Sequence, residues 1–229
     1  MTRHLVVNAD DFGASIGVNR GIIECHTRGI VTSTSLMVTG RAVAEAISMS
    51  REHPGLSIGL HWDVWGEDER EFNLDDTMAV QEEFRRQVEE FHRLLGRLPT
   101  HVDTHRHAHR NRNKRLMPVF QALVAPLGVP LRDDGRVRFV GDFYAQWTWK
   151  VTNLDYISVP ALQRLLREKV PDGWTEFSCH PGYASPDYTS IYLPEREVEV
   201  RTLTDPRIRQ TIDELGIRLV SYADYPGQR

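Results

Sequence analysis

Short apolar runs alternate with helical patterns along the whole chain. The first run, Leu5–Ala9, precedes a stretch with apolar residues at helical spacing, with Ser15 as its N-cap and Gly29 closing it. The predicted strands are Leu5–Ala9, Ser33–Val38, Leu56–Trp62, Thr100–His105, Val129–Arg132, Thr175–Cys179 and Ile217–Tyr222. The predicted helices are Ile16–Thr27, Ala42–Ser50, Val80–Leu95, Leu116–Ala125, Ser158–Lys169 and Asp205–Leu215. This alternation predicts an α/β fold of about seven parallel strands, as a closed barrel or an open doubly wound sheet.

One stretch breaks the alternation. Residues Asp133–Tyr156 show no clean period, and we interpret them as a long excursion over the top of the fold. No shift in composition marks a domain boundary, so we expect a single domain over residues 1–229.

Composition excludes several classes of protein. The 229 residues carry 28 Lys+Arg against 32 Asp+Glu, a formal net charge of −4, which argues against a nucleic-acid partner. No apolar run is long enough to span a membrane. Cys25 and Cys179 lie far apart and form no disulfide framework. We therefore expect a cytoplasmic protein with no membrane or nucleic-acid partner. A homodimer is an alternative to a monomer.

Polar side chains gather where the predicted strands end. In parallel α/β folds the carboxyl ends of the strands lie on one face and build the site. Residues that pack a core would instead be scattered along the strands. The side chains in question are Asp10, Asp11, His61, Asp103, His105 and His180.

The adjacent acids Asp10 and Asp11 leave the first strand. Neighbours in an extended chain point in roughly opposite directions, so the two carboxylates can take different roles. One can bind a metal while the other accepts a proton from metal-bound water. The alternative is that one of them caps the next helix.

Four of the ten histidines lie within His101–His109. If this stretch is extended, its odd-numbered positions share one face, giving three further histidines and Asp103 beside His101. Imidazoles with a carboxylate suit catalytic divalent metals, and Asp103 is placed to orient a ligating ring. An adventitious surface metal site is the competing interpretation.

Other side chains carry weaker signals. Taken by itself, His61 is more typical of a structural residue, and we expect Cys179 to be a buried, inert thiol. The basic stretch Arg106–Arg115 is typical of a solvated loop, with anion recognition as the alternative. Several aromatic residues offer stacking surfaces for a sugar ring, although most large aromatics fill a core. They are Trp62, Trp65, Trp147, Trp149 and Tyr183.

The motifs together resemble the YdjC-like carbohydrate deacetylase family. The matching segments are Asn8–Gly13, Gly59–His61, Pro99–His105 with His107 and His109, and Cys179–Pro181. The resemblance implies a distorted (β/α) barrel and one divalent metal ion (Mg or Zn, with Mn or Co as alternatives). It also implies removal of an acetyl group from an N-acetylated amino sugar or chitooligosaccharide.

The resemblance also implies roles for individual residues. Asp11, His61 and His105 would be the metal ligands, Asp10 the base, and His180 a partner on the leaving-group side. We place a further set around them, as residues that orient ligands or contact the substrate: Asp103, His101, His107, Arg132 and Trp62. The alternatives are hydrolysis of another amide, an ester or a phosphoester, or an inactive metal- or sugar-binding barrel.

Overall fold

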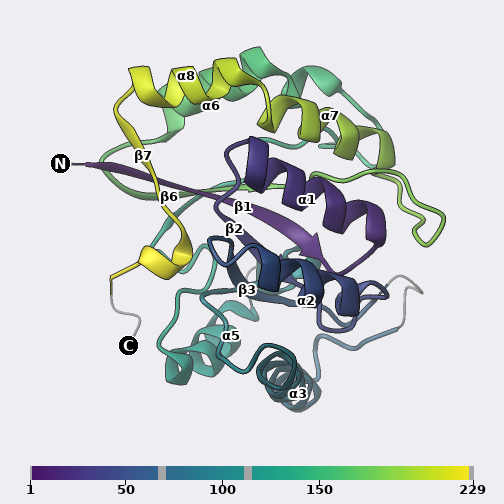
Figure 1. The fold of residues 1–229 in the computed structure, drawn as a ribbon. Helices are drawn as coiled ribbons and strands as arrows, with labels where there is room; N and C mark the ends of the chain where they lie inside the picture. Colours follow the sequence, from purple (N-terminus) through teal and green to yellow (C-terminus); the bar gives the residue numbers. More distant parts are fainter. Residues whose placement is uncertain (1, 67–70, 111–114, 227–229) are drawn as a thin grey trace.

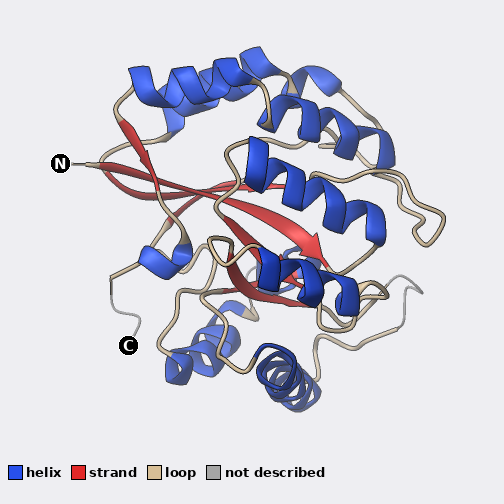
Figure 2. Ribbon diagram, viewed as in Figure 1, coloured by secondary structure: helices blue, strands red, loops and turns tan. Residues whose placement is uncertain are grey.

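The chain folds around one parallel sheet that curls into a half-barrel (Figures 1 and 2). The computed structural model describes residues 2–66, 71–110 and 115–226. The strands are β1 (Arg3–Phe12), β2 (Ser33–Leu36), β3 (Ser57–Trp62), β4 (Val102–Thr104), β5 (Arg138–Val140), β6 (Gly173–Cys179) and β7 (Ile217–Leu219). They lie in the order β4-β3-β2-β1-β6-β5, and β7 pairs with the start of β1. The described pairs are parallel, which confirms the predicted α/β class.

Helices surround the outside of the curved sheet. They are α1 (Ile16–Arg28), α2 (Val43–Glu52), α3 (Thr77–Leu95), α5 (Met117–Val124), α6 (Val159–Lys169), α7 (Leu193–Leu203) and α8 (Pro206–Glu214). In Figure 1, α6, α7 and α8 lie above the sheet and α3 and α5 below it. The predicted caps hold: the Ser15 side chain accepts a hydrogen bond from the backbone N–H of Val18, and Gly96 ends α3 with a left-handed φ of 69°.

The first strand separates an apolar layer from a polar interior. Leu5 and Val7 belong to the main hydrophobic cluster, which joins the sheet to its helices. Val6 belongs to a second, smaller cluster. Because side chains alternate along a strand, Asn8 and Asp10 follow Val6 onto the inner face of the curve. Both are buried, so the half-barrel encloses polar groups near the carboxyl end of β1.

The predicted strand at Val129–Arg132 is wrong. Only Leu131 pairs there, in a single parallel bridge to Val102, and Asp133 turns the chain with a left-handed φ of 59°. The strand is instead Arg138–Val140, inside the stretch predicted as an irregular excursion. Of its three residues only Val140 is buried, so no apolar run marks this strand in the sequence.

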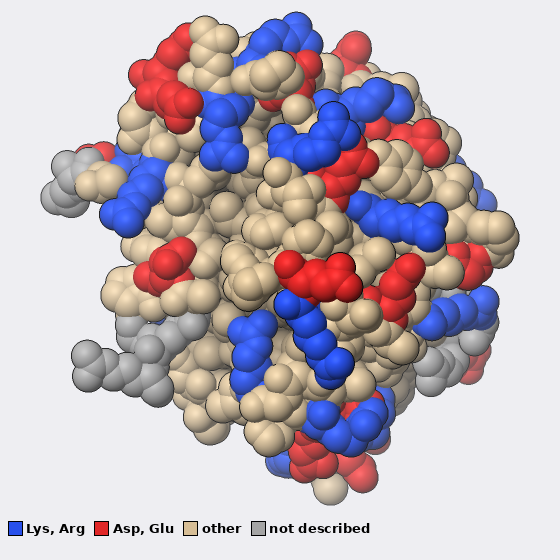
Figure 3. All heavy atoms as spheres, viewed as in Figure 1, with Lys and Arg blue, Asp and Glu red and all other residues tan. Residues whose placement is uncertain are grey.

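The surface carries both signs of charge. Figure 3 shows Lys and Arg side chains interspersed with Asp and Glu across the visible face. Among residues 2–66, 71–110 and 115–226, no helix combines the length and the apolar character needed to cross a bilayer.

Candidate active site

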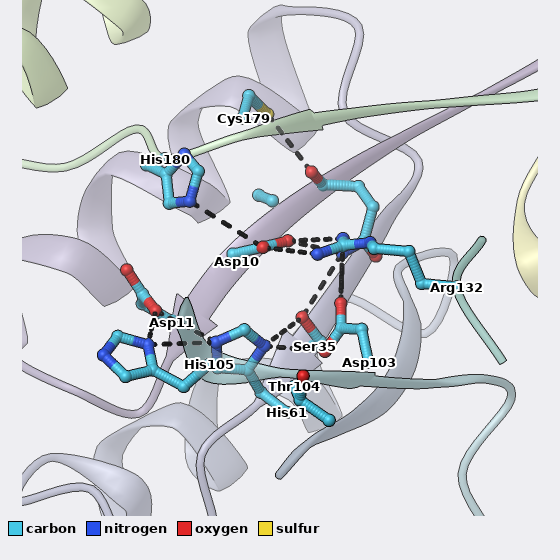
Figure 4. A network of polar contacts seen from close by, with 12 residues as sticks. Asp10, Asp11, Ser35, His61, Asp103, Thr104, His105, Arg132, Cys179 and His180 are labelled. Carbon is cyan, nitrogen blue, oxygen red and sulfur yellow. Dashed lines mark hydrogen bonds and ion pairs between the residues drawn. The ribbon is translucent and has the colours of Figure 1, made fainter. Parts of the chain in front are cut away.

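Asp10 and Asp11 end β1 at a β-bulge. The register with β2 slips by one residue between Ala9 and Phe12, so β1 carries one more residue than its partner there. Asp11 has a φ of 71°, in the left-handed region that aspartate tolerates better than most residues. A bulge re-aims side chains, and both carboxylates reach the same polar cluster (Figure 4).

Asp11, His61 and His105 lie together as a candidate metal site. The Nε2 atom of His61 and the Nδ1 atom of His105 each lie 3.2 Å from the Oδ1 atom of Asp11, and 3.3 Å from one another. Ligands about 2.1 Å from one ion are separated by about 3.0 Å at right angles and about 3.4 Å in a tetrahedron. The observed spacing therefore fits one divalent cation, and three protein ligands leave coordination positions for water and substrate.

Asp103 and Ser35 hold the ring of His61 in place. The Nδ1 atom of His61 lies 2.6 Å from Oδ1 of Asp103 and 3.2 Å from Oγ of Ser35, which leaves Nε2 facing Asp11. A carboxylate behind a ligating histidine fixes its orientation and raises its basicity. Burial lowers the pKa of His61, but the neighbouring carboxylates outweigh burial and hold this pKa well above its ordinary value.

A second group, Asp10, His61 and Asp103, also has donor atoms within reach of one ion. The guanidinium of Arg132 already pairs with both carboxylates, with contacts of 2.6 Å to Asp10 and 2.8 Å to Asp103. Arg132 thus contacts both carboxylates of this group, whereas the Oδ1 atom of Asp11 faces the two imidazole nitrogens. The group containing Asp11 is therefore the better candidate.

Asp10 forms a bidentate pair with Arg132. The two N–H···O distances are 2.6 and 2.7 Å, and the amide of Asn8 donates a further hydrogen bond of 2.9 Å to the same carboxylate. Burial raises the pKa of Asp10, but Arg132 outweighs burial and holds this pKa below its ordinary value. Asp10 is therefore ionised at neutral pH and free to accept a proton.

His180 follows β6 and faces Asp10. Its Nε2 atom lies 3.7 Å from the Oδ2 atom of Asp10, and its backbone N–H donates to the buried carboxylate of Glu199. Burial lowers the pKa of His180 more than the surrounding carboxylates raise it. The ring is therefore mainly neutral in the resting protein, and once protonated it is a stronger acid than an ordinary imidazolium.

Arg196 was not anticipated from the sequence. Its Nη2 atom donates to Oδ2 of Asp11 at 2.6 Å, and its Nη1 atom donates to the carbonyl of His180 at 3.3 Å. Burial raises the pKa of Asp11, but Arg196 and the two imidazoles outweigh burial and hold this pKa well below its ordinary value. The two carboxylates thus have separate arginine partners, as expected of groups with different roles.

Helix α7 carries this unanticipated part of the site. Its buried residues include Glu195, Arg196 and Glu199, so no apolar stripe marks the helix in the sequence. Tyr192 donates a hydrogen bond of 2.7 Å to Glu199, whose pKa burial raises to about 8. One sequence signal could have pointed to this helix. Its charged residues fall on the face that the helix buries, and buried charges need partners.

The histidine-rich stretch is not extended beyond His105. A 3-10 segment runs over His105–Arg110, and Arg106 and His107 have left-handed backbone angles. The prediction of one shared histidine face is therefore wrong. His107 packs edge-on against Phe139, and its Nδ1 atom is buried without a hydrogen-bond partner among the described residues.

Two predicted site residues lie in the core. Trp62 is fully buried against Phe72 and Phe120, and His101 is fully buried and stacks on Tyr222 at 4.0 Å. Neither side chain reaches the surface, which disfavours contact with a substrate; that either one helps to orient the ligands stays a prediction. The side chain after His61 alternates outward to the helices, as strand geometry requires.

The basic stretch Arg106–Arg115 lies partly within the described residues. Arg106 is exposed and lies 5.6 Å from the ring centre of Trp65, while Arg110 pairs with Asp133 at 3.1 Å. The part of this prediction that concerns positions 111–114 lies outside the described residues.

The geometry defines a class: a curled parallel α/β sheet with one acid and two histidines around one candidate metal position, and a buried Asp–Arg pair beside it. The model of the YdjC-like protein family matches residues 4–214, and the chain belongs to that family.

Named relatives cover the chain almost completely. The chain is 34% identical over 258 aligned residues to a chitooligosaccharide deacetylase of Serratia marcescens, with 98% of this chain and 100% of the relative covered. It is 32% identical to a carbohydrate deacetylase of Geobacillus stearothermophilus, covering 98% and 99%. A crystal structure titled as a putative cellobiose-phosphate cleavage protein from Enterococcus faecalis matches with a TM-score of 0.82 and 28% identity, covering 97% and 98%.

Proposed function

We propose that this protein is a metal-dependent carbohydrate deacetylase that hydrolyses the acetamide group of an N-acetylated amino sugar or chitooligosaccharide. One observation carries the proposal. The candidate metal ligands Asp11, His61 and His105 lie beside the Asp10–Arg132 pair and His180, in a chain similar over its whole length to deacetylases. Nucleophile activation and leaving-group protonation are the two demands of amide hydrolysis, and this arrangement meets both.

Asp11, His61 and His105 would hold the ion, with Asp103 orienting His61. A bound divalent cation makes water more acidic and polarises a carbonyl oxygen. The donor set of two imidazoles and one carboxylate suits Zn, Mn or Co, and Mg with additional waters.

Asp10 is the proposed base. Its carboxylate is held ionised and fixed in orientation by Arg132, so it can take the proton of the attacking water without first losing one of its own. A positioned base of this kind contributes about 10²–10⁴ to the rate.

His180 is the proposed acid. The nitrogen that leaves must gain a proton as the carbon–nitrogen bond breaks, and the resting His180 ring is mainly neutral. The Nε2 atom of His180 lies 3.7 Å from Oδ2 of Asp10, so the captured proton can pass from Asp10 to His180 once the two side chains close to hydrogen-bonding distance or one water bridges them. The proton then moves from His180 to the amine, and both side chains return to their starting charge.

The remaining expectations stay predictions. One is that His107 and Arg132 orient the ligands or contact the substrate. The others are that the protein is cytoplasmic and that a homodimer is an alternative to a monomer.

The test is acetate release from N-acetylglucosamine and its β-1,4-linked oligomers. We expect turnover that is abolished by exhaustive chelation and restored by Zn, Mn, Co or Mg. Phosphate esters offered in parallel test the phosphoesterase alternative. Phosphate release without acetate release would reject deacetylation, and sugar binding without any turnover would indicate an inactive binding protein.

A further inference from the structure

Exposed apolar side chains concentrate in one segment, residues 147–156. Nine large hydrophobic side chains are exposed among the described residues, and five of them lie within the ten residues 147–156. Trp147 is 61% exposed and Trp149 is 72% exposed. Exposed apolar surface concentrated in this way marks a contact site for a ligand or another molecule.

The loop that carries Trp147 is firmly built. The buried side-chain amide of Gln146 donates hydrogen bonds of 2.7 Å both to the carbonyl of Ile191 and to Glu195. The backbone N–H of Ala145 donates to the hydroxyl of Tyr192 at 3.0 Å. Trp147 therefore stands exposed on an anchored segment, and little ordering entropy is lost when a ligand contacts it.

A row of aromatic rings connects Trp147 to the site. The ring centres of Trp147 and Tyr144 lie 6.2 Å apart, and those of Tyr144 and His180 lie 5.7 Å apart. Tyr144 is fixed in turn by stacking on Tyr192 at 4.8 Å. The row thus begins at the proposed acid and leads outward to solvent.

The direction of this row fixes which part of a substrate it meets. His180 is the proposed proton donor to the nitrogen, so the sugar that carries this nitrogen lies on the His180 side of the site. The next linked sugar then continues toward Tyr144 and Trp147. The apolar C–H face of a pyranose ring packs on an aromatic ring while its hydroxyls remain in water.

We propose that Tyr144 and Trp147 form a saccharide platform, which binds the sugar unit next to the one that loses its acetyl group. This inference rests on the proposed function and deepens it, because it makes linked amino sugars of two or more units the preferred substrate class.

Trp149 supplies a matched control. It lies two residues further along the same loop, and its described ring contact is with the Nζ atom of Lys150 at 5.6 Å, outside the row. Trp147→Ala and Trp149→Ala remove the same kind of exposed side chain from the same loop, and they differ in position relative to the site.

The test compares these variants on the monomer and on the dimer and trimer of β-1,4-linked N-acetylglucosamine. Trp147→Ala should lower kcat/KM for the dimer and trimer about tenfold, mainly through KM, and change the monomer value less than twofold. Trp149→Ala should leave all three values unchanged.

Binding of the fully deacetylated trimer, measured by calorimetry on the intact protein, needs no turnover. Trp147→Ala should weaken it about tenfold, with an unchanged melting temperature. Unchanged binding and KM would overturn the platform while leaving the deacetylase proposal intact. So would a change of oligomeric state in light scattering without a change in sugar binding, because the patch would then be a contact between copies. Absence of acetate release from every sugar with the wild-type protein would reject the proposed function itself.

Discussion

At the scale of residues, two neighbouring acids of the site have different partners and different proposed roles. Asp10 is paired with Arg132, and Asp11 contacts Arg196 and both candidate ligand histidines. The sequence alone predicted separate roles for the two carboxylates. It placed Arg132 near the site but did not reveal its pairing with Asp10, and it did not reveal Arg196 at all, because each arginine lies more than a hundred positions from its partner.

Substitution of each acid by its amide should separate the two roles. Asp10→Asn should keep the bound metal and lose about 10²–10⁴ in kcat, because the base is removed while the ligands remain. Asp11→Asn should lose the metal, because a ligand charge is lost. Elemental analysis of the purified variants, together with acetate release, checks both. Near-normal activity of Asp10→Asn would show that another group is the base.

Arg196 should act through Asp11. Arg196→Met removes the hydrogen bond to Oδ2 of Asp11, and loss of such a partner of a metal ligand costs about 10–100-fold in metal affinity. Competition with a chelating dye measures this affinity. Arg201→Met is the matched control, since Arg201 lies exposed near the end of the same helix. Equal affinities for the two variants would contradict the role of Arg196.

At the scale of elements, the turn after β6 lies directly on helix α1. A Cβ atom added at Gly21 would lie 2.5 Å from the Cα atom of Gly182, and one added at Gly17 would lie 2.0 Å from the carbonyl oxygen of Tyr183. The backbone N–H of Tyr183 also donates to the carbonyl of Gly17 at 3.0 Å. Two glycines one helical turn apart therefore let the segment that carries His180 approach the helix closely.

The sign of the stability change caused by Gly21→Ala tests this contact. Alanine normally stabilises a helix interior by about 1 kcal/mol relative to glycine. Here we expect a lower melting temperature and a lower kcat, because the turn and His180 must shift. Thermal unfolding and acetate release check this, with Arg20→Ala as the control at an exposed neighbour. A more stable, fully active Gly21→Ala would mean that the turn can move without consequence.

Prediction from sequence succeeded at this scale where an element was long, or where a glycine or a polar residue marked its end. Helix α3 combines an apolar stripe with Gly96 at its end, and the polar residues at the ends of β1, β3 and β4 do meet. Prediction failed at β5, where only one of three residues is buried, and at α7, where buried charges replace the stripe. Both failures have one cause: tertiary partners, which no local pattern contains, decide these elements.

At the scale of the whole molecule, buried neutral histidines tie stability to pH. Burial is the main cause that lowers the pKa of His101 to about 4 and that of His109 to about 3. His107, whose pKa is also lowered to about 4, adds to this effect, whereas Glu199, with its pKa raised to about 8, holds a proton in the folded chain and offsets one ring. Between pH 6.5 and 4.5 the unfolded chain therefore still binds more protons than the folded chain, and the free energy of unfolding falls as the pH falls. The raised pKa of His61 gives no slope in this range, because its contribution is complete below about pH 6.5.

We expect chelator-treated protein to lose on the order of 3 kcal/mol of unfolding free energy between pH 6.5 and 4.5. Urea unfolding at a series of pH values measures it. His109→Gln should flatten the dependence by about one proton. A free energy of unfolding that stays constant or rises as the pH falls would contradict the assignment of neutral buried rings.

Arg132 lies where the curled sheet fails to close. Beside it, Leu131 makes a single bridge to β4, and the guanidinium reaches carboxylates on β1, β4 and β6 through Asp10, Asp103 and Glu176. A cation thus spans the seam that a further strand would fill in a closed barrel. Arg132 consequently sets the basicity of Asp10 and, through the same contacts, holds the open side of the sheet together. Any attempt to redesign the chemistry at this position must therefore supply a replacement positive charge.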